Sequence, residues 1–133
     1  MVRRHYTPDL ATRSLPLVSR IAADVQATAL AMQATWHRLR AKPPAEPAPP
    51  AAAADRTVLQ DEFESLRERF EALIGELEQM GVELKDPMTG LLDFRARRGS
   101  EDVYLCWRLG EDSVTHWHTL QTGFAGRRPM AEF

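Results

Sequence analysis

Two histidines two positions apart, His116 and His118, are the side chains of this sequence best suited to bind a metal ion. Alternate residues of a strand leave the same face of a sheet, so the two imidazoles would lie together on an extended segment. Asp93 and Glu111 are the carboxylates that could complete such a site. Nitrogen and oxygen ligands of these types suit zinc or iron. The sequence therefore offers four candidate metal ligands, although histidines hydrogen-bonded inside a small sheet, with the carboxylates in turns or ion pairs, are the commoner arrangement.

The turn before the histidines decides which residues they meet. A two-residue turn at Gly110-Glu111 would place both of them on the apolar face of the sheet, with Val103 and Leu105. A loop one residue longer would bury Trp117 and place the histidines beside three polar side chains. These are Asp93, Tyr104 and Cys106. The metal hypothesis requires the longer loop.

Cys106 and His118 together suggest a second kind of chemistry, a nucleophile with its general base. No oxyanion-hole motif and no third orienting residue accompany them, and a free cysteine is often simply buried. We therefore treat this pair as the weaker hypothesis.

A glycine-containing segment near the C-terminus could bind an anion through backbone amides and two guanidinium groups. The residues of this candidate anion site are Gly123, Gly126, Arg127 and Arg128. It lacks the strand, loop and helix context of a phosphate-binding loop, and its glycines could instead let the tail turn back across the sheet.

The composition is that of one globular domain spanning residues 1–133, with 44% hydrophobic and 27% charged residues. A single cysteine excludes an internal disulfide framework and a cysteine-based zinc cluster. The net charge of −2 gives no basic excess for nucleic acid, and no apolar run is long enough for a signal-peptide core or a membrane span. We expect a soluble cytoplasmic protein that binds neither nucleic acid nor membranes.

Two amphipathic segments predict a helical hairpin. Residues 58–80 carry apolar side chains at spacings of four and three, which place one stripe along a helix ended by Gly81. The stripe consists of Leu59, Phe63, Leu66, Phe70, Leu73, Leu77 and Met80. Residues 8–40 predict the other helix, with Thr7 as its N-cap and a kink or a new start near Pro16.

Charge and length indicate that these two helices pair in antiparallel fashion. Residues 1–42 carry seven basic and two acidic side chains, whereas residues 55–80 carry eight acidic and three basic ones. The proline- and alanine-rich residues 41–54 between them predict an extended linker. The same apolar stripe could equally pair with a second chain as a coiled coil.

After Gly81 the apolar period changes from that of a helix to that of a strand. Two alternating runs flank Gly99-Ser100, a dipeptide suited to a two-residue hairpin turn, and a third strand is expected over residues 113–118. Closing on that turn aligns Arg98 with Glu101 and Leu92 with Trp107, so that charges and apolar residues both match. The expected fold is of the α+β class: a long antiparallel helical hairpin, then a small three-stranded antiparallel β-meander with a glycine-containing tail over residues 81–133.

Short motifs in residues 81–129 carry a resemblance to a known family. They are Lys85-Asp86-Pro87, Gly90-Leu91-Leu92-Asp93-Phe94, Leu105-Cys106-Trp107, Gly110-Glu111, Trp117-His118, Gly123-Phe124 and Gly126-Arg127. With these motifs the chain resembles an uncharacterised bacterial family, domain of unknown function 2203. The resemblance implies a shared fold without an established activity, and it singles out further motif residues. These are Phe94, Cys106, Trp107, Gly110 and Trp117.

Two hypotheses for function remain. The preferred one is a non-enzymatic binding or assembly module, whose helical hairpin joins a protein partner or a second copy of the chain. The alternative is a small metal-binding protein or metal-dependent enzyme that uses Asp93, Glu111, His116 and His118 to hold zinc or iron. The first is preferred because no complete set of catalytic groups can be identified, so the sequence leaves open whether the protein is an enzyme.

Overall fold

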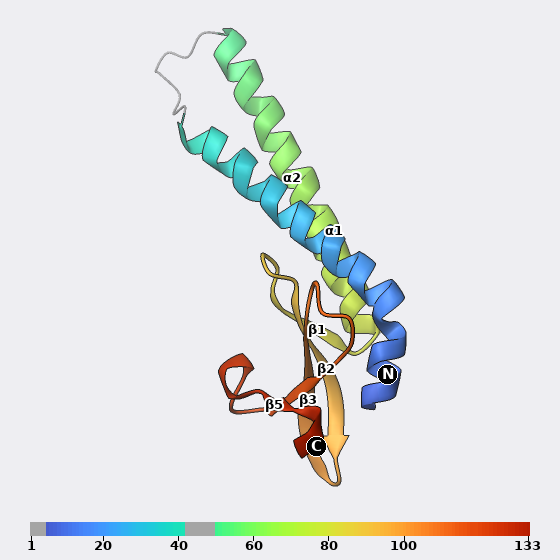
Figure 1. Ribbon diagram of the computed structural model, residues 1–133. Coiled ribbons are helices and arrows are strands. Elements are labelled where there is room, and N and C mark those ends of the chain that lie inside the picture. The colour runs from blue at the N-terminus through green and yellow to red at the C-terminus, as the bar shows by residue number, and fades with distance from the viewer. Residues whose placement is uncertain (1–4, 42–49) are drawn as a thin grey trace.

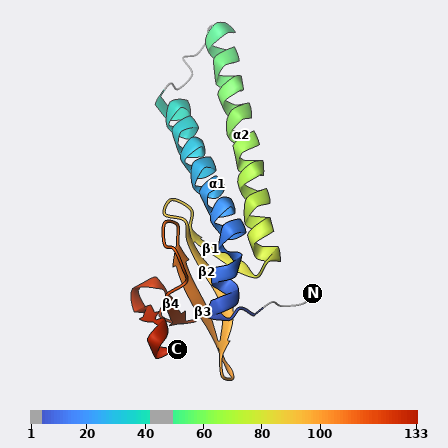
Figure 2. The same ribbon diagram turned by 45° about the vertical axis from the view of Figure 1, so that its right-hand side comes forward.

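The computed structural model describes residues 5–41 and 50–133, which form two long helices and one antiparallel sheet (Figures 1 and 2). The helices are α1 (Pro8–Ala41) and α2 (Pro50–Gln79). The strands are β1 (Val82–Asp86), β2 (Leu91–Arg98), β3 (Glu101–Arg108), β4 (His116–Thr119) and β5 (Arg128–Pro129). This arrangement confirms the α+β class.

Helix α1 begins where the sequence predicts. The Thr7 side-chain oxygen accepts a hydrogen bond from the amide of Leu10 at 3.2 Å, which caps the helix. Pro16 lies inside one continuous helix, so the alternative of a new start there is wrong. Leu15 and Val18 beside it are buried in the core, and this packing holds the backbone helical across the proline.

Helix α2 begins at Pro50, eight residues before the predicted start, so the prediction of an extended linker over residues 41–54 is wrong at both ends. Pro50 takes a position in the first turn, where proline is favoured, and four alanines with the highest helix propensity follow it. The remaining part of that predicted linker, residues 42–49, lies outside the described residues. Arg56 donates to the Leu39 carbonyl at 3.0 Å and so ties α2 to the end of α1.

The sheet has five strands in the order β1-β2-β3-β4-β5, all antiparallel, and not the three that were predicted. The two strands that were not predicted are β1, which starts three residues after the last residue of α2, and β5, which is two residues long and contains Pro129. The third predicted strand starts at His116 and not at residue 113. In β1, Val82 and Leu84 alternate with Glu83 and Lys85, so a sequence signal for this strand was present. The two residues of β5 are too few to alternate, so only its pairing with β4 reveals it.

The pairing of β2 with β3 has the predicted register. Arg98 pairs with Glu101, Phe94 with Leu105 and Leu92 with Trp107, around a turn in which Gly99 has a φ of 62°. Only glycine adopts such a positive φ without strain, which explains why the turn lies there.

The pairing of β3 with β4 settles the turn that the sequence left open. Cys106 pairs with His116, Leu105 with Trp117 and Tyr104 with His118. This is the register of the longer loop, so both histidines lie on the polar face and Trp117 is buried. The loop is held from outside the sheet: the Val114 amide donates to the Thr12 side-chain oxygen of α1 at 3.1 Å.

The core lies between α1, α2 and the apolar face of the sheet (Figure 2). Tyr6 joins the two layers, because its amide donates to the Arg95 carbonyl, its hydroxyl donates to the Met80 carbonyl, both at 2.7 Å, and its ring packs edge-on to Phe94. The buried sheet residues of this core are Val82, Leu92, Phe94, Ala96, Val103, Leu105, Trp107 and Trp117. Every second residue of these strands therefore points away from the helices. In the part of the chain that the structure describes, neither helix has an apolar stretch that could cross a bilayer.

Candidate metal site

Three buried polar side chains meet on the face of the sheet that points away from the helices. Asp93 comes from β2, Cys106 from β3 and His118 from β4, and their exposed fractions are 3%, 1% and 3%. Asp93 lies directly opposite Cys106 in the strand register, and His118 lies two residues along from the partner of Cys106. A chemically reactive cluster with this little exposure needs a partner for every charge that it carries.

Both ring nitrogens of His118 are engaged. Nδ1 lies 2.7 Å from the Thr119 carbonyl oxygen, and Nε2 lies 2.9 Å from Oδ2 of Asp93. A carbonyl oxygen only accepts, so Nδ1 carries a proton and donates it. In the neutral ring, Nε2 therefore presents a lone pair to Asp93, and one positive charge must lie between the two atoms for the contact to be favourable.

Cys106 completes a compact set of three different ligand types. One ligand atom from each of Asp93, Cys106 and His118 lies within 4.8 Å of the others. Burial raises the pKa of the Asp93 carboxyl, against the opposing hydrogen bond from His118. Burial, together with the charge of Asp93, raises the pKa of the Cys106 thiol to about 11. Burial is thus the main cause that raises the pKa of both groups.

The C-terminal tail closes this face. The guanidinium of Arg127 stacks over the Phe124 ring at 4.5 Å and lies 3.7 Å from a carboxylate oxygen of Glu111. Arg127 also acts on Cys106, because its hydrogen bond and its charge oppose the rise of the thiol pKa. One guanidinium nitrogen of Arg127 is buried without a hydrogen-bond partner. The positive charge of Arg127 therefore lies near the Cys106 thiol.

A second polar network borders the site on the side of β1. Glu83 accepts hydrogen bonds from the Tyr104 hydroxyl at 2.7 Å and from the Arg95 guanidinium at 3.0 Å. Burial works to raise the pKa of Glu83, but hydrogen bonds from Tyr104, Arg95 and Lys85 outweigh it and lower that pKa. The Tyr104 ring also packs on the His118 ring, with centroids 5.4 Å apart. Tyr104 thus couples this network to the histidine.

A comparison with family models shows to which protein family the chain belongs. The family model of an uncharacterised conserved protein, DUF2203, matches residues 4–130. The chain belongs to the DUF2203 family. No curated protein and no solved structure matches this DUF2203 chain.

In this DUF2203 protein the structure brings together two of the four metal ligands that the sequence suggested. Asp93 and His118 meet, whereas His116 and Glu111 lie outside the compact group found among the described residues. His116 Nδ1 contacts the neighbouring Thr115 hydroxyl at 2.8 Å. Glu111 accepts a hydrogen bond from the Arg108 amide at 2.7 Å, so its carboxylate serves the loop. That is the turn and ion-pair role considered as the commoner arrangement.

Cys106 was missing from the predicted ligand set. The longer-loop alternative already placed it on the face of Asp93 and the histidines, and this shared face was the available signal. Its thiol does not have the geometry of an activated nucleophile, because both nitrogens of His118 already have partners.

The residues of the predicted anion site have partners within the chain. Arg127 turns toward Glu111, whereas Arg128 stacks over the Trp117 ring at 5.6 Å. The amides of Gly126 and Arg127 donate to carbonyls within their own turn, at Gly123 and Phe124. The anion site stays a prediction.

The opposite pKa shifts of Asp93 and Glu83 predict opposite effects on the pH dependence of stability. The folded state holds the proton of Asp93 above about pH 3.9, where the unfolded chain releases it, so stability is lost as pH rises through the raised pKa. Glu83 has a lowered pKa, so its contribution is present above about pH 4.3 and is lost as pH falls. We expect Asp93→Asn to make the slope of unfolding free energy against pH more positive, and Glu83→Gln to make it less positive. Urea denaturation of chelator-treated protein at several acidic pH values measures both slopes, and a change of the same sign in both variants would contradict the assignment.

Proposed function

We propose that this protein binds one divalent transition-metal ion, zinc or ferrous iron, through Asp93, Cys106 and His118. The observation that carries the proposal is the contact between His118 Nε2 and Asp93 Oδ2 at 2.9 Å, with Nδ1 already donating to the Thr119 carbonyl. The two facing lone pairs require a proton or a metal ion between them. A metal ion would replace the proton there and would gain the Cys106 sulfur as its third ligand.

The ligand set and its surroundings fit such an ion. Zinc binds nitrogen and oxygen at about 2.0–2.1 Å and sulfur at about 2.3 Å, so two tetrahedral ligands lie roughly 3.3 Å apart. The Asp93 and His118 atoms would need to separate by only a few tenths of an ångström. A histidine that donates its other N–H to a backbone carbonyl is the usual arrangement around a metal ligand, because it fixes the tautomer and the ring orientation.

The metal hypothesis now takes precedence over the assembly module that the sequence favoured. The sequence suggested two carboxylates and two histidines as ligands, but it could not show whether they lie close together in the fold. The fold supplies a different set, in which Cys106 replaces His116 and Glu111 and all three members are buried. The function proposed for these residues is to bind a metal ion.

Calorimetric titration of chelator-treated protein with zinc, and with ferrous iron under anaerobic conditions, tests the proposal. We expect one equivalent of metal to bind, with release of protons, because the thiol and the Asp93–His118 pair must give them up. Affinity should fall as the pH is lowered. With cobalt(II) as a probe, a thiolate-to-metal charge-transfer band should report the sulfur ligand.

Cys106→Ala and His116→Ala form a matched pair for this experiment. Cys106→Ala keeps the Asp93–His118 contact, so the fold should persist while metal affinity falls at least about 100-fold and the charge-transfer band disappears. His116→Ala removes an imidazole from the same face and should bind metal as the wild type does. The absence of binding heat with either metal, or equal losses in both variants, would overturn the proposal.

A further inference from the structure

The half of the helical hairpin that is remote from the sheet is poorly covered. We call it the distal hairpin: residues 28–41 of α1 and 50–70 of α2, which extend beyond the strands (Figures 1 and 2). In this half α1 buries only Thr28 and Thr35, whereas its other half buries apolar side chains. The two threonine hydroxyls donate to carbonyls of their own helix, at Asp24 and Ala31, so they need no further partner.

The apolar stripe of α2 is only half-buried here. Among its residues Leu73 and Leu77 alone are fully buried, and both lie at the end near the sheet. The stripe residues of the distal hairpin are half-buried: Leu59, Phe63, Leu66 and Phe70. Two helices cannot enclose such a stripe by themselves, because each helix covers only one side of the other.

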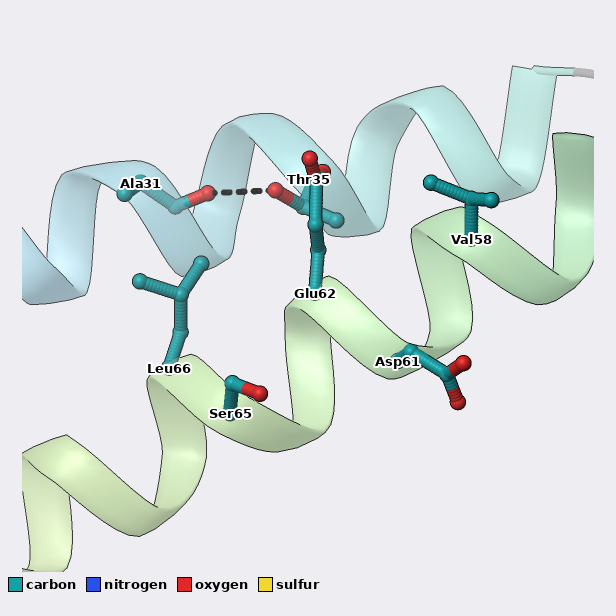
Figure 3. Close-up of a pocket in the computed structure, with 7 residues that line it drawn as sticks. All are labelled: Ala31, Thr35, Val58, Asp61, Glu62, Ser65 and Leu66. Carbon is teal, nitrogen blue, oxygen red and sulfur yellow. Dashed lines mark hydrogen bonds between the residues drawn. The ribbon is translucent and has the colours of Figure 1, made fainter.

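A groove runs between the two helices in this region. Val58, Glu62 and Leu66 rise from one side of α2 toward α1, and Ala31 and Thr35 of α1 form the other wall (Figure 3). Val58 is 58% exposed, although it is an apolar residue in the middle of the distal hairpin. The groove is therefore open to solvent, and its lining mixes apolar side chains with polar ones, Glu62 among them.

We infer that the distal hairpin docks against a second copy of this chain to form an antiparallel four-helix bundle. The charges of the helices support this occupant. Within the distal hairpin, α1 carries two arginines and no acidic residue, whereas in α2 five acidic residues outweigh three arginines. If α1 of one copy lies against α2 of the other, every neighbouring pair in the bundle has opposite charge, and like charges lie on the diagonals. One chain thus supplies both complementary surfaces, as a two-fold symmetric interface requires.

The solution mass tests this inference. The wild-type chain should have twice its monomer mass of 15.0 kDa by light scattering, and its melting temperature should rise with protein concentration. Val58→Glu places a charge in the groove of both copies and should weaken the dimer at least about tenfold. Because Val58 is exposed in the single chain, the helix content of the variant should be unchanged by circular dichroism.

Leu17→Glu is the matched control. Leu17 is 53% exposed on α1 but lies outside the distal hairpin, so this variant should remain a dimer. A monomeric wild type, or a Val58→Glu protein that stays as dimeric as Leu17→Glu, would overturn the inference. Metal binding should be unchanged in Val58→Glu, so this test and that of the metal site give separate answers.

Discussion

Replacing His118 with alanine should cost about 3–5 kcal/mol of unfolding free energy in chelator-treated protein. Asp93 would then lie buried without the partner that its carboxylate now has at 2.9 Å. Leaving one member of a buried pair uncompensated costs more than the pair itself contributes, because the remaining group keeps its full desolvation penalty. Urea denaturation of the chelator-treated protein measures this loss directly.

Combining His118→Ala with Asp93→Ala tests whether the loss of stability comes from the unpaired Asp93 carboxyl. Once His118 has been replaced, Asp93→Ala should cost little or should restore stability, since it removes the orphaned carboxyl. The sum of the two single effects should therefore exceed the effect of the double variant by more than about 1 kcal/mol. Additive effects would show that the two side chains do not interact. His116→Ala serves as the control, with a loss below about 1 kcal/mol, because that ring is partly exposed and bonds to the adjacent threonine hydroxyl.

Phe94→Ala should also lower the unfolding free energy by about 3–5 kcal/mol. The Phe94 side chain is 0% exposed and packs against the Tyr6 ring at 5.0 Å, at the junction of helix and sheet.

The sequence pattern alone would assign the same cost to Phe70, a member of the apolar stripe. Because Phe70 is only half-buried, its replacement should cost about half as much. Denaturation in the Val58→Glu background measures both without a contribution from association, and equal costs would show that the stripe is fully enclosed within one chain.

The hairpin of β2 and β3 shows how much sequence can predict when the interactions are local. Gly99 supplies the positive φ of the turn, and from that turn every cross-strand pair follows by counting. Charge matching between Arg97 and Asp102 agrees with apolar matching between Phe94 and Leu105. Because the charge pattern and the apolar pattern both require the same register, no other register of β2 and β3 satisfies both. Asp93 and Cys106 were therefore placed opposite each other by the sequence alone.

The position of His118 depended on a contact that sequence spacing does not contain. A loop shorter by one residue would have turned His118 into the core, and the local sequence allowed both lengths. The loop adopts its register because Val114 is buried and its amide bonds to Thr12, which lies 102 residues away on α1. Asp93, Cys106 and His118 thus share one face of the sheet in the register of a loop that α1 contacts.

The sequence by itself determined the two amphipathic helices, the β2–β3 register and the polar face that carries Asp93 and Cys106. Periodicity reports which side chains share a face, since it follows from backbone geometry within one segment. Tertiary structure alone decided the pairing of β1 and β5, the buried contact of His118 with Asp93, and the unequal burial of the α2 stripe. Each of these depends on what covers a face, and the covering elements come from distant parts of the chain: the sheet encloses Leu73 and Leu77 but ends before it reaches Phe63.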